Sequence, residues 1–418
     1  MIGTRDSLER RAQRLVDRAG ELAAITSRAG GCTRLAFSAE LAAALDLLRG
    51  WLEPLGLRCE MDAAGNLSAV LPGTDPRSPR LLLGSHLDTV LDGGRWDGAL
   101  GVLVAADCLE LLADASTPPV CDVEILVFAD EEGVRFGPGC FGSRALAGQV
   151  PASELDLVDA DGVRLREALD GHTRAGGALE SARRDPRTLG AFLEVHIEQG
   201  RALEQLDLPI GVVSAIAGNT RAELRFDGLA GHAGTVPMGE RHDALAAAAA
   251  WTVAVERRAS EEPELVGTVG ALSALPGQVN VIAGSARATL DVRGPDDAKR
   301  RRVVEQLRGD AEHQAGLRGA RVTWTETLDR PAVPMDPRLV DDARMALARS
   351  GHEPPVLVSG AGHDAAVMAS LCPTLLLFVR CREGLSHHPD EHVAPEDVRS
   401  ALEATDIVLE EWLARWRR

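Results

Sequence analysis

The spacing of apolar residues predicts an α/β sheet in the first part of the chain. Leucine and isoleucine recur near helical spacing within the first 50 residues, which indicates helices there. Two short apolar runs follow at Arg80–Ser85 and Val123–Phe128, and such runs are typical of parallel strands covered on both faces. Gly98–Leu112, between them, has the pattern of a helix. Because strand, helix and strand alternate, the expected fold class is α/β.

A further strand, with one apolar and one polar face, is expected at Phe192–Glu198. Leu193, Val195 and Ile197 alternate there with polar residues, among them His196. Taken alone, the polar face could simply meet water.

The pattern changes near residue 208 and returns to the α/β style after residue 330. The middle stretch predicts strands at Ile210–Ile216, Arg221–Phe226, Val266–Leu272 and Ala286–Val292, and helices at His242–Arg258 and Asp296–Gly316. Two helices among four or more strands indicate a compact α+β sandwich. The last stretch predicts helices at Pro337–Ser350, at His363–Leu371 and from Pro395 onward, and strands at Pro355–Val358 and Thr374–Val379. We therefore expect one α/β domain in two segments, 1–209 and 330–418, with a second domain inserted at 210–329.

Composition narrows the classes of partner. The 418 residues carry a formal net charge of −18, which disfavours nucleic acids and anionic membranes as partners. The longest apolar run, around Ala244–Val255, is shorter than the roughly 20 residues that a membrane helix needs. The first residues are charged and contain no apolar signal-peptide core. Seven cysteines without a CxxC pair predict reduced thiols and a cytoplasmic protein.

Candidate chemistry follows the predicted strands at their carboxyl ends. His86 and Asp88 follow the first buried strand, and Glu131 and Glu132 follow the second. The polar strand carries His196, the last strand leads to His387 and His388, and Asp97 precedes a helix. Ligands of open α/β sheets bind beyond the carboxyl ends of the strands, so these side chains are expected at one rim.

Imidazoles and carboxylates at one rim predict a hydrolytic site with two metal ions. These ligands suit zinc, manganese, cobalt or nickel. Two adjacent ions need a shared carboxylate, and a second acid can take a proton from water. Each residue also has a plainer interpretation: Asp97 could be a helix N-cap, Glu131 and Glu132 a solvated pair, and His86 a structural histidine.

The motifs around these residues resemble the hydantoinase/carbamoylase branch of the aminoacylase and carboxypeptidase-type metallohydrolases. That branch contains allantoate amidohydrolase, N-carbamoyl-L-amino acid hydrolase and β-ureidopropionase. The similar segments are Gly84–Val90, Asp97–Gly98, Glu131–Gly137, Gly142–Arg144, Glu194–Gly200, Gly231–Met238, Val279–Ile282, Gly360–Ala365 and Ser386–His387. The resemblance implies a mixed sheet flanked by helices, as in zinc exopeptidases, and an inserted lid or dimerisation domain.

The resemblance also implies roles for the residues at the rim. His86 and His196 would hold the first of two divalent ions, Glu132 and His387 the second, and Asp97 would bridge them. Glu131 would be the general base and acid, and Asp88 would orient His86.

Further roles implied by the resemblance concern the substrate. His232, Asn280 and Arg293 of the inserted domain would contact it, with His232 stabilising the oxyanion, and the inserted domain would form a homodimer. Gln199 and the loop Gly360, Ala361 and Gly362 would line the pocket. Arg293 could instead pair with Asp291 or Asp296 at a strand end. The chain contains no tyrosine, so the oxyanion donor is another side chain.

Several positions depart from the usual motifs. His388 follows His387 where the family usually has a small polar residue, so either histidine could be the ligand. The stretch Phe378–Gly384 lacks the usual Pro-Ser, and its Arg380 and Cys381 are expected to face the pocket and alter specificity.

The expected function is hydrolysis of a linear ureido or amide C–N bond in a small anionic substrate. Allantoate is the first candidate, and its hydrolysis would release ammonia and carbon dioxide. An N-carbamoyl-L-amino acid or β-ureidopropionate is the second candidate. Deacylation of N-acyl amino acids, dipeptide cleavage and a binding protein without activity also remain open. A serine nucleophile is not expected, because the chain has no Gly-x-Ser-x-Gly motif.

Overall fold

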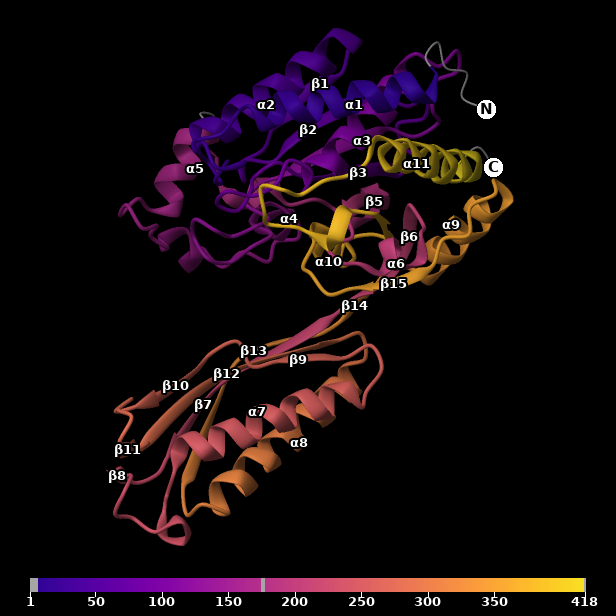
Figure 1. Ribbon diagram of the computed structural model, residues 1–418. Helices are drawn as coiled ribbons and strands as arrows, with labels where there is room; N and C mark the ends of the chain where they lie inside the picture. The colour runs from indigo at the N-terminus through magenta and orange to yellow at the C-terminus, as the bar shows by residue number, and fades with distance from the viewer. Residues whose placement is uncertain (1–6, 174–176, 417–418) are drawn as a thin grey trace. The chain divides into compact units, whose positions relative to one another are not determined.

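The computed structural model describes residues 7–173 and 177–416, which form two compact units (Figure 1). The first unit comprises residues 1–214, 335–357 and 362–418, and the second comprises residues 215–334 and 358–361. In both units the buried strands and the longer helices follow the apolar patterns.

The first unit contains a mixed sheet between layers of helices. Its strands are β1 (Arg58–Met61), β2 (Leu67–Leu71), β3 (Arg80–His86), β4 (Val123–Phe128), β5 (Leu189–Ile197), β6 (Ile210–Ile216), β15 (Val356–Ser359) and β16 (Thr374–Val379). The sheet also includes β14 (Val333–Pro334), the last residues of the 215–334 segment. Its helices are α1 (Leu8–Ala23), α2 (Ala39–Leu52), α3 (Ala99–Ala113), α4 (Phe141–Leu146), α5 (Leu165–Thr173), α6 (Ala202–Leu206), α9 (Pro337–Arg349), α10 (Asp364–Met368) and α11 (Pro395–Trp416). The sheet order is β1-β2-β4-β3-β5-β16-β6-β14, with β15 also paired to β6.

The centre of this sheet is parallel and its margins are antiparallel. β3 pairs parallel with β4 and β5, and β5 pairs parallel with β16. β2 joins β4, and β6 joins β16, in the antiparallel sense. The mixed α/β sheet expected from the sequence is confirmed. Because the four central strands run in one direction, their carboxyl ends share one edge.

Helix α3 forms the core between this sheet and an outer layer of helices. Nearly all its side chains are apolar and buried, and it packs against β3, β4 and β5 on one side and α1 and α11 on the other. The charged exceptions are Asp107 and Glu110, and the carboxylate of Asp107 accepts hydrogen bonds from Arg11 of α1. Arg11 also binds Asp406 of α11, so one buried guanidinium joins three helices.

The second unit is an α+β sandwich. Its elements are β7 (Gly218–Asp227), β8 (Gly231–His232), α7 (Ala244–Ser260), β9 (Val266–Thr268), β10 (Leu272–Leu275), β11 (Val281–Ile282), β12 (Ser285–Gly294), α8 (Asp297–Gly316) and β13 (Arg321–Arg330). The sheet order is β10-β12-β7-β13, with β9 also paired to β12, and α7 and α8 lie side by side on one face (Figure 1). Trp251, Phe226 and Leu307 are among the side chains of the core between helices and sheet.

The single strand expected at Val266–Leu272 is wrong, because the structure has two strands there, β9 and β10. Both pair with β12, but the ladder is interrupted between them. There the N–H of Ala271 donates to the side-chain hydroxyl of Thr289 instead of a backbone carbonyl.

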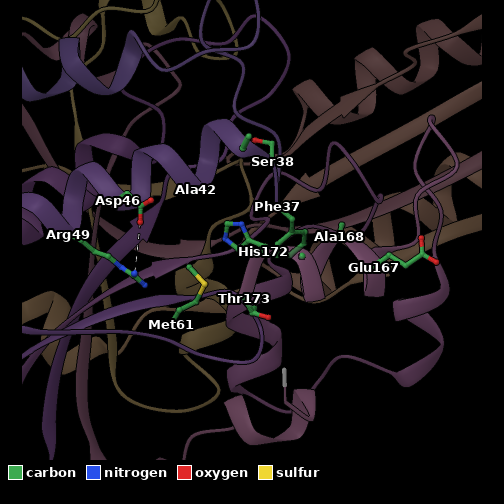
Figure 2. A pocket seen from close by; sticks show the side chains of 12 residues that line it. Phe37, Ser38, Ala42, Asp46, Arg49, Met61, Glu167, Ala168, His172 and Thr173 are labelled. Carbon is green, nitrogen blue, oxygen red and sulfur yellow. Dashed lines mark ion pairs between the residues drawn. The ribbon is translucent and has the colours of Figure 1, made fainter. Parts of the chain in front are cut away.

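Within the described residues, no helix is both long and apolar enough to cross a membrane. One hollow of about 600 Å³ opens on the first unit between α2 and α5 (Figure 2). Phe37, Met61 and His172 line it, and Asp46 and Arg49 form an ion pair of 4.0 Å at its side. The hollow contains none of the metal-ligand candidates.

Candidate metal centre

The central strands of the first unit carry the candidate ligands to one edge of the sheet. β3 ends at His86, and the loop after β4 contains Glu131 and Glu132. His196 lies near the end of β5, and His387 lies in the loop after β16. Asp97 lies in the turn that leads into α3.

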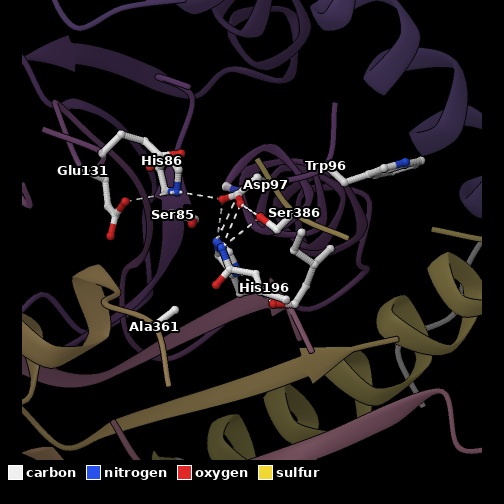
Figure 3. Close-up of polar contacts among 12 residues, drawn as sticks. Ser85, His86, Trp96, Asp97, Glu131, His196, Ala361 and Ser386 are labelled. Atoms are coloured by element: carbon white, nitrogen blue, oxygen red, sulfur yellow. Dashed lines mark hydrogen bonds and ion pairs between the residues drawn. The ribbon is translucent and has the colours of Figure 1, made fainter. Parts of the chain in front are cut away.

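Asp97 lies between two groups of side chains, and each of its oxygens faces one of them. Oδ1 is 3.6 Å from Nε2 of His86 and 3.2 Å from Nε2 of His196, while Oδ2 is 3.5 Å from Nε2 of His387 (Figure 3 shows the first two histidines). Oε2 of Glu132 lies 3.4 Å from the same His387 nitrogen. The ligand atoms of each trio, His86–Asp97–His196 and Asp97–Glu132–His387, lie within 4.8 Å of one another.

Glu131 lies beside this cluster, next to His86. Its Oε2 is 3.7 Å from Nε2 of His86, and its Oε1 accepts a hydrogen bond of 3.5 Å from the thiol of Cys140. It forms a third close group with His86 and Glu132. The carboxylate is therefore close enough to exchange a proton with a molecule held in the cluster.

The structure contradicts the plainer interpretations of Asp97, His196, Glu131 and Glu132. The cap of α3 is Gly98, and no side chain bonds to that helix end, so Asp97 is not an N-cap. His196 is 2 % exposed and does not face water. The side chains of Glu131 and Glu132 are 11 % and 7 % exposed and are not a solvated pair.

Main-chain carbonyls orient both buried histidines. Nδ1 of His86 lies 3.0 Å from the carbonyl oxygen of Asp88, and Nδ1 of His196 lies 2.9 Å from that of Ile197. A carbonyl only accepts, so Nδ1 of each ring carries a proton, and Nε2 faces the cluster.

The carboxylate of Asp88 has a different role from the one expected. It lies 3.8 Å from Nδ1 of His86, and it accepts hydrogen bonds from the backbone N–H groups of Glu131 at 3.2 Å and Glu132 at 3.1 Å. Asp88 thus orients His86 through its carbonyl and fixes the Glu131–Glu132 loop through its side chain.

Charge and unpartnered atoms show that the cluster fits a cation. Burial raises the pKa of Glu131 well above its ordinary value, and the carboxylates of Asp364 and Glu132 add to the rise. Burial, then the charge of Asp97, raises the pKa of Glu132 to about 9. Oε1 of Glu132 is buried without a hydrogen-bond partner. Acids this close to one another retain protons unless a cation replaces them.

In the pair of Asp97 and His196, the pKa of the acid is lowered and that of the histidine is raised. Burial acts to lower the pKa of His196, but the carboxylate of Asp97 outweighs it and raises that pKa to about 9. Burial acts to raise the pKa of Asp97, but the neighbouring His196 holds it below the usual range. Asp97 is therefore the acid of the cluster that stays ionised most readily.

Gln199 contacts the cluster itself. Its Nε2 donates to Oδ2 of Asp97 at 2.8 Å and to the hydroxyl of Ser386 at 3.1 Å, and Ser386 also donates to Oδ2 of Asp97. Oε1 of Gln199 is buried without a partner. The side chain is thus fixed at one end, with its amide oxygen left for another donor.

The second unit places His232 and Asn280 together. β8 pairs with β11, so that His232 lies opposite Val281, and the N–H of Ala233 donates to the carbonyl of Asn280 at 2.9 Å. Arg293 lies at the other end of the ten-residue strand β12, beside Asn219 of β7. At about 3.3 Å per residue, that strand separates the two places by roughly 25–30 Å.

Arg293 makes one of the two pairings that the sequence left open. Its Nε and Nη2 donate to Asp291 at 2.8 and 3.2 Å, and its Nη1 donates to the carbonyl of Gly360 at 2.6 Å. Arg221 donates to the same Asp291 at 2.9 Å. Two guanidinium groups share one carboxylate, so this strand end keeps a net positive charge. Ala361 stays in the same loop through two hydrogen bonds with Ser359, and Gly362 begins the next segment of the first unit.

The expectation that Arg380 faces the pocket is wrong. Arg380 donates to Asp397 of α11 at 2.9 and 3.1 Å and to Asp207 at 2.8 Å, so it anchors a helix, and Cys381 is fully buried. Of the two adjacent histidines, His387 is in the cluster, whereas Nδ1 of His388 accepts from the N–H of Asp390 at 3.1 Å.

One residue of the site, Glu391, was not expected from the sequence. It is 2 % exposed and lies against the loop of Asp97. Nothing in the local pattern separates it from the exposed acids nearby, such as Glu383 and Asp390.

Comparison with known proteins agrees with this geometry. Peptidase family M20/M25/M40 matches residues 82–411. The chain belongs to this family. Members of the M20 family are metal-dependent hydrolases, and the chain is accordingly a hydrolase of C–N bonds. The resemblance noted from the motifs is confirmed.

The relatives of this M20 member include amidohydrolases of two kinds. An N-carbamoyl-L-amino acid amidohydrolase of Geobacillus stearothermophilus is 39% identical over 387 residues, which cover 92% of this chain and 94% of the relative. An allantoate deiminase of Arabidopsis thaliana is 37% identical over 421 residues, with 92% and 79% covered. Among solved structures, a hydantoinase/carbamoylase family amidase from Burkholderia multivorans superposes with a TM-score of 0.90 at 32% identity, covering 96% of this chain and 97% of that one.

Proposed function

We propose that this M20 member is a dinuclear amidohydrolase that cleaves a linear ureido C–N bond in a small carboxylate, with allantoate as the first candidate. The observation that carries the proposal is that Asp97 belongs to both trios of ligands and turns one carboxylate oxygen toward the histidines of each. His86 and His196 would hold one divalent ion, Glu132 and His387 the other, and Asp97 both. Zinc, manganese, cobalt and nickel all suit this donor set.

The residues around the cluster divide the reaction between them. Divalent ions bound here supply Lewis-acid chemistry, which makes water more acidic and polarises the scissile carbonyl. Glu131 takes a proton from the attacking water and passes it to the nitrogen that leaves as the C–N bond breaks. The carbamate released from an N-carbamoyl group then decomposes to ammonia and carbon dioxide.

We also propose substrate contacts for residues of the second unit. We assign His232 as donor to the oxyanion, Asn280 as a substrate ligand and Arg293 as the group that binds the substrate carboxylate. Gln199, with its unpartnered Oε1, and the loop Gly360–Gly362 would complete the pocket.

A homodimer through the second unit explains why these contacts are spread along β12. One small substrate cannot bridge 25–30 Å, so His232 and Asn280 of one copy would serve the site of the other copy. Both residues are exposed, and they lie beside apolar side chains that are also exposed: Val279 is 103% and Met238 is 77% exposed. Exposed apolar groups of this kind are typical of a surface that another chain covers.

The alternative activities use the same kind of site and differ in their substrates. N-Carbamoyl-L-amino acids, β-ureidopropionate and N-acyl amino acids share the carboxylate and the scissile carbonyl. A binding protein without activity would lack a metal ligand or the general base. This chain has all five ligand candidates and the base Glu131. The seven cysteines are unpaired in the structure, in keeping with a reducing cytoplasmic location.

The test is ammonia release from each ureido compound by protein loaded with each divalent ion, before and after treatment with a chelator. We expect release from allantoate or an N-carbamoyl-L-amino acid, loss with the chelator, and recovery when the ion is returned. Absence of turnover with all these compounds, including N-acyl amino acids, would contradict the enzyme proposal.

A further inference from the structure

Glu391 binds the main chain of the residue that joins the two trios. Its Oε1 accepts hydrogen bonds from the backbone N–H groups of Trp96 at 2.7 Å and Asp97 at 3.0 Å. The residue is 2 % exposed, so water does not compete for these bonds. Two adjacent N–H groups on one carboxylate oxygen fix the direction in which the Asp97 side chain leaves the backbone.

The chain provides space for this carboxylate at Gly94. A Cβ at Gly94 would lie 2.2–2.3 Å from the side chain of Glu391, closer than any real contact. Gly94 does not have a positive φ, so its backbone would accept another residue. The absence of a side chain at Gly94 therefore matters because Glu391 occupies that space.

Glu391 belongs to the same loop as His387, a ligand of the other trio. The N–H of Arg382 donates to the carbonyl of His392 at 2.9 Å and closes the base of this loop. Ser386, next to His387, donates to Oδ2 of Asp97. The loop thus contacts Asp97 twice, once at its backbone and once at its carboxylate.

We propose that Glu391 is a positioning residue that couples the two metal trios through Asp97. By holding the backbone of Asp97 against the loop of His387, it keeps Oδ1 toward His86 and His196 and Oδ2 toward His387. Without it, two buried N–H groups lose their acceptor, and Asp97 no longer faces both trios. The proposal rests on the metal cluster of the proposed function but not on the identity of the substrate.

A direct ligand role for Glu391 is the competing explanation. Its Oε2 is buried without a partner, as a ligand atom would be. Among the described residues, however, the groups able to hold an ion do not include Glu391. The two roles differ in what they need: positioning needs one acceptor oxygen, whereas ligation needs the negative charge.

The experiment is a titration of the metal-free full chain with Mn²⁺. Electron paramagnetic resonance measures the free Mn²⁺ at each step, and the titration gives the number of ions bound and their Kd. Glu391→Gln keeps a carbonyl oxygen for both N–H groups, and we expect two ions with a Kd within about threefold of the parent. Glu391→Ala removes the acceptor, and we expect both ions to bind about 10–100-fold more weakly, as when other supports of metal ligands are removed.

Two further variants make the result specific. Asp390→Asn changes the neighbouring exposed acid and should bind Mn²⁺ as the parent does. Gly94→Ala leaves Glu391 in place but pushes a methyl group against it, and should weaken Mn²⁺ binding in the same direction as Glu391→Ala. Far-UV circular dichroism of the metal-free proteins shows whether each is folded, and Gly94→Ala provides the test if Glu391→Ala is not.

The proposal is overturned if folded Glu391→Ala, or Gly94→Ala in its place, keeps the Kd of the parent. It is also overturned if Glu391→Gln binds as weakly as Glu391→Ala, because the charge is then required. Metal binding is measured without substrate, so failure of this proposal is distinguishable from failure to hydrolyse any ureido compound.

Discussion

Asp97 presents its two carboxylate oxygens to different sets of side chains. Oδ2 accepts from Gln199 and Ser386 and also faces His387, whereas Oδ1 faces His86 and His196. The donors on Oδ2 hold the carboxylate in a fixed plane, so its two oxygens cannot exchange places. At the scale of the residue, this asymmetry is what allows one side chain to serve two different trios.

Glu131→Gln should separate catalysis from metal binding. Glutamine cannot take the proton from water, so we expect kcat for ammonia release to fall by about 10²–10⁴-fold. Glu131 lies outside both trios, and the number of ions bound per chain should stay at the parental value. Activity equal to that of the parent would remove Glu131 as the base.

Arg293→Ala should raise KM for substrates with a carboxylate. The loss of a hydrogen bond between charged groups, about 1.5–3 kcal/mol, corresponds to roughly a 10–100-fold increase. Arg221→Ala is the matched control, because Arg221 also donates to Asp291, whereas the bond to the Gly360 carbonyl comes from Arg293. An equal rise of KM for an uncharged analogue would argue against a carboxylate contact.

The residue types at the cluster could be predicted from sequence, but several of their partners could not. Histidine and carboxylate are ligands typical of hydrolytic metal sites, and strand ends place them at one edge. His86 could contact either the carboxylate or the carbonyl of Asp88, and Arg293 could bind either substrate or Asp291. Differences in distance of less than 1 Å to a few Å decide between these partners. Those are set by packing rather than by residue type.

At the scale of the element, buried strands and amphipathic helices were predictable and short or exposed strands were not. β3, β4 and β16 are apolar runs with two covered faces, and their bounds agree with the pattern. β1 has only four residues, and β13 alternates apolar and polar residues only as far as Trp324, so the pattern marks both strands weakly. Backbone pairing with β2 and β7 holds them instead.

The contact of α3 with β5 should tolerate no added methyl group. A Cβ at Gly101 of α3 would lie 2.3 Å from the carbonyl oxygen of Val195, next to His196. Gly101→Ala should lower the free energy of unfolding by roughly 1–3 kcal/mol, and weaken Mn²⁺ binding because β5 must move.

Gly50→Ala in α2 is the control for that change. A Cβ at Gly50 meets nothing within 4 Å, and a helical alanine should stabilise by roughly 0.5–1 kcal/mol. Denaturant unfolding of the metal-free proteins compares the two, and equal stability of the two variants would contradict tight packing at Gly101.

At the scale of the whole molecule, the second unit is expected to complete the active site of a second copy. A mixture of two inactive variants tests this. In a dimer of Glu131→Gln with His232→Ala, one site would combine an intact Glu131 with an intact His232. After the subunits exchange, we expect about a quarter of the parental activity, since half the dimers are mixed and each has one complete site.

No recovery in that mixture, in spite of proven exchange, would mean that His232 serves its own chain. The matched control pairs Glu131→Gln with His387→Ala. Both changes lie in the first unit, so no mixed dimer contains a complete site.

The order of the ligands along the chain affects how the enzyme is made. Five of the six site residues have been synthesised by His196, but β5 receives its neighbour β16 only after the ribosome has passed residue 374. The second unit, residues 215–334, lies between them and has its own core. We therefore expect the second unit of a nascent chain to fold first. At that stage the sheet of the first unit still lacks β16, and the cluster still lacks His387. Metal loading should be one of the last events of biosynthesis, and chains released early should remain inert.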